Sequence, residues 1–381
     1  MEEITTPAEV KPGKATLEAE EIKYYTATQF QLVWWRFKKH RLAILGSIIL
    51  ILFLIIVVFA EFLAPTSAQT RNSNCLLGPP QKLRFFDDEG GFHLRPFVYG
   101  VRTVRNPETL RLEFEEDTSV KMPLRFFVKG EPYRLWGLFP TDLHLFGVEG
   151  GFIHLFGTDA LGRDVLSRIL FGTRVSLSIG VAGVMVSFVL GLLLGGASGY
   201  FGGWIDFVVQ RAIEFIRSMP TLPLWMALAA ALPKEWPPLR VYFMITVILS
   251  FVGWTTLARR VRGMLLSLRE EDFVIAARIA GSGGARIIAR HMLPSFMSYI
   301  IVDLSVSFPY MILGETALSF LGIGLRPPVV SWGVLLQASQ NIRSIAMHPW
   351  LFTPSGFVIL AVLAFNFVGD GLRDAADPYS K

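Results

Sequence analysis

The sequence has a single cysteine and no nucleotide-binding glycine loop. These two features exclude a disulfide-stabilised protein and an ATPase of the P-loop type. Cys75 is the single cysteine among 381 residues, so a framework of disulfides within the chain is excluded. No G-x-x-x-x-G-K-[ST] segment is present, so any ATP hydrolysis has to belong to another chain. The six histidines are scattered along the sequence and indicate no metal centre and no intramembrane catalytic site.

Charged residues are also scarce, at 18%, whereas hydrophobic residues make up 52% of the chain. With a mean hydropathy of +0.47, this composition is typical of a membrane protein and excludes a wholly soluble one. A net charge of +5 is compatible with nucleic-acid binding. However, the arginines of residues 259–269 adjoin apolar segments, so the positive-inside rule explains them better. We therefore expect membrane lipid, and no nucleic acid, around this chain.

Apolar segments long enough to cross a bilayer recur along the chain. They predict an all-α polytopic membrane protein with six transmembrane helices, at about 42–63, 174–198, 207–232, 240–258, 294–318 and 350–368. A basic cluster precedes the first span and places the N-terminus in the cytoplasm: Arg36, Lys38, Lys39 and Arg41. An even number of spans then places the C-terminus on the same side. The second span is rich in glycine, which permits close helix packing in lipid.

Three residues within the predicted spans are candidates for a translocation pathway. Pro220 and Pro223 are expected to kink the third span and to free backbone carbonyl groups, although most kinked helices simply pack. Asp303 is expected in the outer half of the fifth span, where an ionisable side chain needs a partner or water. Two interpretations of Asp303 stay open: an ion pair or hydrogen bond with a facing span of a partner subunit, or a pathway residue that attracts a cationic group.

The long polar region between the first two spans predicts a small β-rich insert outside the membrane. Residues 109–116 and 120–128 alternate apolar and polar side chains, which is typical of half-buried strands. We expect an antiparallel β subdomain at about 80–140, and we expect Cys75 to be reachable from outside. The insert ends in residues 157–177, where four side chains are expected to form an ion-pair network at the start of the second span: Asp159, Arg163, Asp164 and Arg168.

A polar interruption at 270–294 separates two apolar segments and has the features of a helix-turn-helix. Three acids precede an apolar helix at 273–280, where they suit the positive end of the helix dipole. Gly281 begins a glycine-rich break, a second short helix follows, and Pro294 can begin the next long helix. One interpretation is a basic segment resting on anionic headgroups. The paired alanines Ala276 and Ala277 and the compact turn favour docking into a groove of a partner protein.

This segment resembles the EAA loop of binding-protein-dependent ABC importers, in which Glu-Ala-Ala is followed by a glycine and later by Leu-Pro. The residues in register with that pattern are Ala276, Ala277, Gly281, Leu293 and Pro294, and His291 is similar to the histidine of the oligopeptide and dipeptide branch. Ile275 departs from the pattern, because it occupies the position of the glutamate. Further blocks at 157–177, 314–333 and 366–378 resemble the oligopeptide, dipeptide and nickel permease family, in the same order and spacing.

The resemblance implies a type I ABC importer permease in the inner (cytoplasmic) membrane, with both termini cytoplasmic. It implies a second homologous permease subunit, two cytoplasmic ABC ATPases and an extracytoplasmic solute-binding protein as partners. ATP and magnesium would bind the ATPases, and this chain would be a transport subunit with no catalytic residue, metal or cofactor. Peptides are the implied substrate, while oligosaccharides and nickel complexes remain alternatives. A membrane sensor with an external ligand-binding subdomain is the alternative from another class.

The expected organisation follows from these assignments. Residues 1–35 form a cytoplasmic N-terminal tail, 36–64 the first transmembrane helix and 65–170 the extracytoplasmic insert. Residues 171–372 form the core permease domain with five transmembrane helices and the coupling loop at 270–294, and 373–381 form a cytoplasmic tail.

Overall fold

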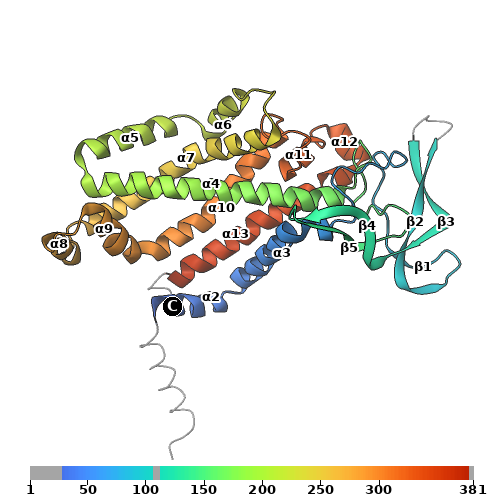
Figure 1. Cartoon of the computed structure of the whole chain (residues 1–381), viewed down its shortest axis with the longest axis horizontal. Coiled ribbons are helices and arrows are strands. Elements are labelled where there is room, and N and C mark those ends of the chain that lie inside the picture. Colours follow the sequence, from blue (N-terminus) through green and yellow to red (C-terminus); the bar gives the residue numbers. More distant parts are fainter. Residues whose placement is uncertain (1–27, 106–111, 377–381) are drawn as a thin grey trace, which may run out of the picture.

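The computed structural model describes residues 28–105 and 112–376, and most of these residues are helical. Within these ranges, five helical segments are long and apolar enough to cross a membrane. They form an elongated bundle (Figure 1) and comprise α3 (Arg41–Leu63), α4 (Val165–Phe201), α7 (Pro238–Leu268), Gly284–Phe320 with α10 (Met297–Phe320), and Pro349–Ala376 with α13 (Pro354–Ala376). A shorter helix, α2 (Gln29–Lys39), precedes α3 and carries the basic residues of the N-terminal region.

The continuous helix expected at 207–232 is not present. The structure divides this segment into α5 (Gly203–Arg217) and α6 (Thr221–Ala230). Pro220 stands at the N-terminal boundary of α6, with an extended ψ of 130°, so the chain leaves the helical path instead of bending within it. α6 is apolar but, with 10 residues, too short to cross a bilayer alone.

The closest helix packing joins α4 and α7 through a row of glycines, which confirms the expected close packing of the second span. Gly191, Gly195 and Gly199 recur every fourth residue and so lie on one face of α4. A Cβ atom at Gly195 would lie 2.5 Å from the carbonyl oxygen of Ala258, so no larger residue fits there. Gly191 meets Leu257 and Gly199 meets Leu265, so the two helices run parallel.

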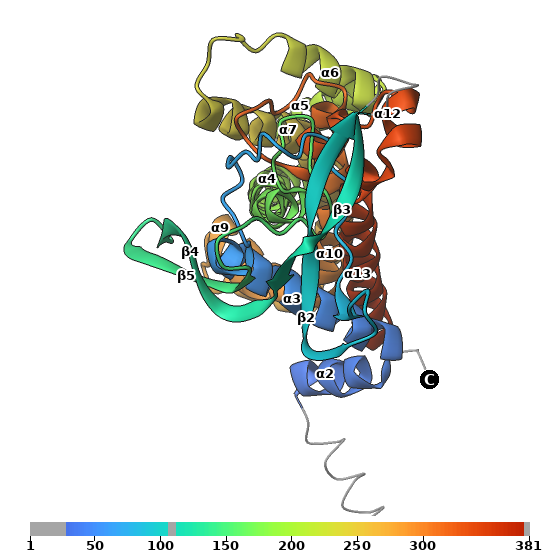
Figure 2. The same cartoon turned by 90° about the vertical axis from the view of Figure 1, so that its right-hand side faces the viewer.

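Five strands lie between α3 and α4. β1 (Arg84–Phe86), β2 (Phe92–Arg105) and β3 (Leu112–Pro123) form one antiparallel sheet, while β4 (Arg125–Leu135) and β5 (Phe139–Gly147) form a separate hairpin. The two strands expected at 109–116 and 120–128 differ from this arrangement. One long β3 covers 112–116 and continues to Pro123, whereas residues 125–128 begin β4; residues 109–111 lie outside the described ranges. The hairpin protrudes sideways from the helix bundle (Figure 2).

Candidate functional site

The segment between α7 and α10 is a helix-turn-helix at the end of the bundle farthest from the strands (Figure 1). α8 (Asp272–Ile279) is followed by the short α9 (Gly284–Ile287). A π-helical turn (Ile288–Met292) and a 3-10 turn (Leu293–Phe296) then lead into α10. The expected helix, break and second short helix are therefore present, but Pro294 lies within the 3-10 turn and does not begin α10.

Gly281 ends α8 in a conformation that favours glycine. Its φ is +78°, in the left-handed region that L side chains rarely adopt. The N–H of Gly281 donates to the carbonyl oxygen of Arg278 (3.0 Å), and the N–H of Ser282 donates to that of Ala277 (3.1 Å). These two bonds form a Schellman motif, which satisfies the last carbonyl groups of the helix and fixes the direction of the chain.

The inner side of α8 and α9 packs on the bundle. Val274 and Ile287 are fully buried, and Ala277 is partly buried against the same cluster. The cluster also contains residues of α7, of the two turns before α10 and of the start of α10: Leu257, Val261, Leu265, Met292, Phe296 and Ile300. One apolar core therefore joins α8 and α9 to α7 and to the start of α10.

The outer side of α8 presents an apolar surface, which we call the α8 knob and define as Phe273, Ile275, Ala276 and Ile279. Ile279 is 82% exposed, and Phe273 and Ile275 are both more than 40% exposed. Ile275 and Ala276 are four and three positions before Ile279, so both side chains lie next to that of Ile279 on one face. Exposed apolar side chains gathered in this way indicate a surface that a partner covers.

The structure thus separates the residues that the sequence had grouped. Ala276 belongs to the knob, whereas Ala277 faces the core of its own chain. His291 and Leu293 are half-buried in the turns that lead to α10, and Pro294 is exposed as the second residue of the 3-10 turn. The sequence analysis missed Phe273 and Ile279, although their spacing from Ala276 was a readable signal of a shared face.

Asp303 forms an ion pair with Arg260 of α7. The Asp303 side chain is only 7% exposed, whereas that of Arg260 is 46% exposed. The expectation that Asp303 lies in the outer half of its span is wrong, because it lies in the half of α10 that adjoins α8 and α9. Its ion-pair partner comes from the same chain, so a partner subunit is not needed to compensate the carboxylate.

Pro220 and Pro223 belong to α6 and not to a kinked spanning helix. Pro220 precedes the first residue of α6, Pro223 lies in its first turn, and both are exposed. α6 contacts α10 through Trp225 and Tyr310, whose ring centroids are 5.3 Å apart. The structure therefore places the two prolines at the start of α6 and Asp303 on α10.

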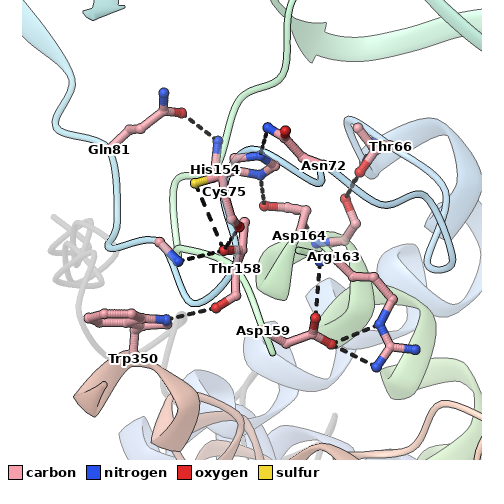
Figure 3. Close-up of polar contacts among 12 residues, drawn as sticks. Thr66, Asn72, Cys75, Gln81, His154, Thr158, Asp159, Arg163, Asp164 and Trp350 are labelled. Atoms are coloured by element: carbon pink, nitrogen blue, oxygen red, sulfur yellow. Dashed lines mark hydrogen bonds and ion pairs between the residues drawn. The ribbon is translucent and has the colours of Figure 1, made fainter. Parts of the chain in front are cut away.

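The start of α4 is held by the expected ion-pair network, with one correction (Figure 3). Arg163 Nε donates to the Asp159 carboxylate (2.8 Å), which also pairs with Arg168. Burial opposes ionisation of Asp159, but the two arginines outweigh it and hold its pKa below the ordinary value. The expectation that Asp164 also pairs with an arginine is wrong. It accepts from the Ser167 N–H (2.7 Å) as the N-cap of α4 and lies 3.3 Å from His154 Nδ1.

Thr158 is the centre of a second set of contacts in the same place (Figure 3). Its hydroxyl accepts from the Gly78 N–H (2.7 Å) and donates to the Cys75 carbonyl oxygen (2.5 Å). Its carbonyl oxygen accepts from Trp350 Nε1 (2.9 Å), far along the chain. Cys75 is only 2% exposed, so the expectation that it is reachable from outside is wrong. These contacts join the segment before the strands (Cys75 and Gly78) and the segment after them (Thr158) to Trp350, which precedes α13.

Glu315 of α10 is fully buried among hydroxyl groups, a feature that the sequence analysis did not single out. It accepts hydrogen bonds from Ser176 (3.1 Å), Ser319 (2.8 Å) and Ser331 (2.7 Å). Ser331 is also the N-cap of the short helix α11 (Trp332–Gln337), so the carboxylate joins α4, α10 and α11. These bonds compensate for burial of the carboxyl group.

Together, the apolar bundle and the exposed helix-turn-helix at its end define an integral membrane component that a partner protein contacts. The model of the family described as "binding-protein-dependent transport system inner membrane component" matches residues 187–380, which is about half of the chain. The chain belongs to this family. A second family model, "N-terminal TM domain of oligopeptide transport permease C", matches residues 28–80. Residues 81–186, which include the five strands, lie between the two matched ranges.

Curated relatives agree with this assignment. The chain is 37% identical over 226 residues to the oligopeptide transport system permease protein OppC of Bacillus subtilis, covering 59% of this chain and 72% of the relative. It is 36% identical over 260 residues to a putative peptide permease protein of Brucella suis, covering 67% and 83%. It is 41% identical over 226 residues to OppC of Escherichia coli, covering 59% and 72%. The resemblance to the oligopeptide and dipeptide permeases is therefore confirmed.

Proposed function

We propose that this chain is a permease subunit of an ATP-binding-cassette importer and forms half of the translocation pathway for peptides. Its relatives are named oligopeptide and dipeptide permeases. The α8 knob is the single observation that carries the proposal, because an exposed apolar helix held by a rigid turn is suited to a groove of another protein.

The partners in this proposal are a second homologous permease subunit, two cytoplasmic ATPases and a solute-binding protein outside the inner membrane. ATP and magnesium bind the ATPases, and this chain contributes no catalytic group. Closure of the ATPases moves the α8 knob, and the cluster around Val274 and Ile287 passes the movement to α7 and α10. Ile275 then contributes apolar contact where the EAA pattern has a glutamate.

The type I architecture with six crossings is also proposed, with α5 and α6 together making the third crossing. α4 and α7 run parallel, since Gly191 meets Leu257 and Gly199 meets Leu265. The chain between them therefore has to return from the end of α4 to the start of α7, and α5 and α6 are the elements that do so. Six crossings place both termini on the cytoplasmic side together with the α8 knob.

A matched pair of substitutions tests the docking role. Ile279 on α8 and Ile342 on α12 (Ile342–Met347) are 82% and 83% exposed, and Figure 1 shows their helices at opposite ends of the helix bundle. Ile279→Asp should reduce co-purification of the ATPase subunits and ATP-dependent peptide uptake, because a carboxylate would be buried in an apolar contact. Ile342→Asp should leave the ATPases bound. Equal retention of the ATPases by both variants would contradict the proposal.

Substrate class is tested separately on the cognate solute-binding protein. We expect it to bind short peptides, with oligosaccharides and nickel complexes as the competing ligands in the same titration. Binding of an oligosaccharide alone would replace the peptide assignment and leave the docking role of α8 intact.

A further inference from the structure

The β4–β5 hairpin exposes an unusual number of large apolar side chains for an element outside the helix bundle. Its exposed aromatic and leucine residues are Phe126 (65%), Phe127 (64%), Trp136 (51%), Leu138 (72%) and Phe139 (58%). If water surrounded the hairpin, this exposed apolar surface would favour aggregation. The pattern therefore indicates that an apolar surface covers these side chains.

The hairpin is held in a defined position against the last turns of α3. Trp136 Nε1 donates to the carbonyl oxygen of Val58 (2.7 Å), and the Trp136 and Phe59 rings lie 6.0 Å apart. α3 is locally non-helical at Phe59 (φ −114°, ψ 28°), next to the carbonyl that Trp136 contacts. At the base of the hairpin, the His144 ring lies 2.6 Å from the carbonyl oxygen of Ala64.

The backbone supports this presentation of aromatic side chains. Phe127 and Trp136 both have a φ of +55°, which is uncommon for residues other than glycine. Both side chains are nevertheless exposed, while Phe127 keeps one ring contact with Phe62 of α3 (6.2 Å). The unusual conformations thus occur at the residues that display aromatic rings beside the membrane helix.

Between the hairpin and α3 runs an open apolar groove of about 450 Å³. Its walls are Ile55, Phe59 and Phe62 from α3 and Leu135, Phe139 and Leu143 from the hairpin, and no charged side chain lines it. Tyr133, also in the wall, donates its hydroxyl to the Leu143 carbonyl oxygen (2.6 Å). The groove therefore offers hydrocarbon contact and has the chemistry that suits an acyl chain.

The groove continues the face of α3 that meets the bilayer. In the most apolar part of α3 only 17% of the residues are buried within the protein. The corresponding share is 28% to 56% in the other four spanning segments of the described chain. Trp136 lies near the end of this helix, where tryptophan is typical of the membrane–water interface. We infer that the β4–β5 hairpin rests on the bilayer at the end farthest from α8 and that its groove with α3 binds an acyl chain of a membrane lipid.

Site-specific fluorescence on the full chain, assembled with its partner permease subunit in lipid nanodiscs, tests this inference. Cys75 is first replaced by alanine, and single cysteines at Leu138 (hairpin tip), Phe139 (groove wall) and Thr118 (exposed on β3) are labelled with bimane. The probes are phosphatidylcholine brominated on its acyl chains and iodide in the water phase. Leu138→Cys removes little buried contact, because this side chain is 72% exposed.

We expect the brominated lipid to reduce the fluorescence of both hairpin labels and iodide to have little effect on them. Thr118→Cys should show the reverse. If iodide quenches the hairpin labels as strongly as the control, the hairpin is in water and the inference is overturned. If neither probe reaches them, a protein covers the hairpin, which also overturns it. Quenching by lipid at 138 but not at 139 would refute the acyl-chain site in the groove.

Discussion

Replacing Gly281 by valine tests whether the turn after α8 sets the position of the knob. The turn depends on φ +78° at Gly281 and on the two hydrogen bonds that close the helix. A Cβ at Gly281 would meet no atom within 4 Å, so the substitution strains the backbone without a steric clash. We expect Gly281→Val to uncouple ATP hydrolysis from transport, and the cause is the strained conformation of the turn.

The size of the effect follows from the left-handed conformation. An L residue there costs about 1–2 kcal/mol, which reduces the population of the native turn by about 5- to 30-fold. Valine belongs at the upper end, since it is β-branched. Membrane insertion should be unchanged, because Val274 and Ile287 stay packed in the core. Gly283 is the matched control: its φ is −67° and its Cβ position is also free, so valine there adds bulk without strain.

The assay reconstitutes the permease pair with the ATPases and the solute-binding protein, and it measures peptide imported per ATP hydrolysed. Gly281→Val should lower this ratio while basal ATPase activity remains, and Gly283→Val should stay close to the wild type. Wild-type import by a fully assembled Gly281→Val complex would refute the reasoning. An equal loss in both variants would show that bulk, and not the turn, is responsible.

Further predictions concern the ion pairs and the topology. Asp303→Asn should lower the free energy of unfolding in detergent by about 1–3 kcal/mol, which is less than for a fully buried pair because Arg260 is half-exposed. Adding Arg260→Gln should recover part of this loss. Unchanged stability and transport would contradict a role for the pair. In a background without the native cysteine, a cysteine at Thr118 should react with a membrane-impermeant maleimide only from outside, and one at Ser282 only from the cytoplasm; labelling of both from one side would contradict six crossings. Asp159→Asn should leave Arg168 buried without a full counter-charge and make the segment before α4 sensitive to limited proteolysis, whereas wild-type resistance would show that the pair contributes little.

Length and apolarity predicted most of the membrane helices, because a bilayer imposes both on any crossing segment. The same reasoning failed at 207–232. Pro220 and Pro223 were expected to kink one continuous helix, but whether a proline kinks a helix or separates two helices depends on the packing around it, which the sequence does not show. Hence α5 and α6 were expected as one helix.

At the candidate site, local features were predictable and tertiary ones were not. Gly281 and the break after α8 follow from residue type, since glycine is favoured at positive φ. The different directions of Ala276 and Ala277 depend on how α8 lies on α7. The Asp303–Arg260 pair joins two helices whose register no local pattern reveals, and the burial of Cys75 depends on contacts with Thr158.

The contact between Trp350 and Thr158 has a consequence for biogenesis. The two residues are 192 positions apart, so the turn before α4 receives this hydrogen bond only after nearly the whole chain has been synthesised. Ser176 gains its hydrogen bonds with Glu315 and with the N–H of Trp332 after a similar delay. The insert is therefore synthesised early but gains this contact late. A nascent chain that ends before residue 350 would lack the hydrogen bond from Trp350 to the turn before α4.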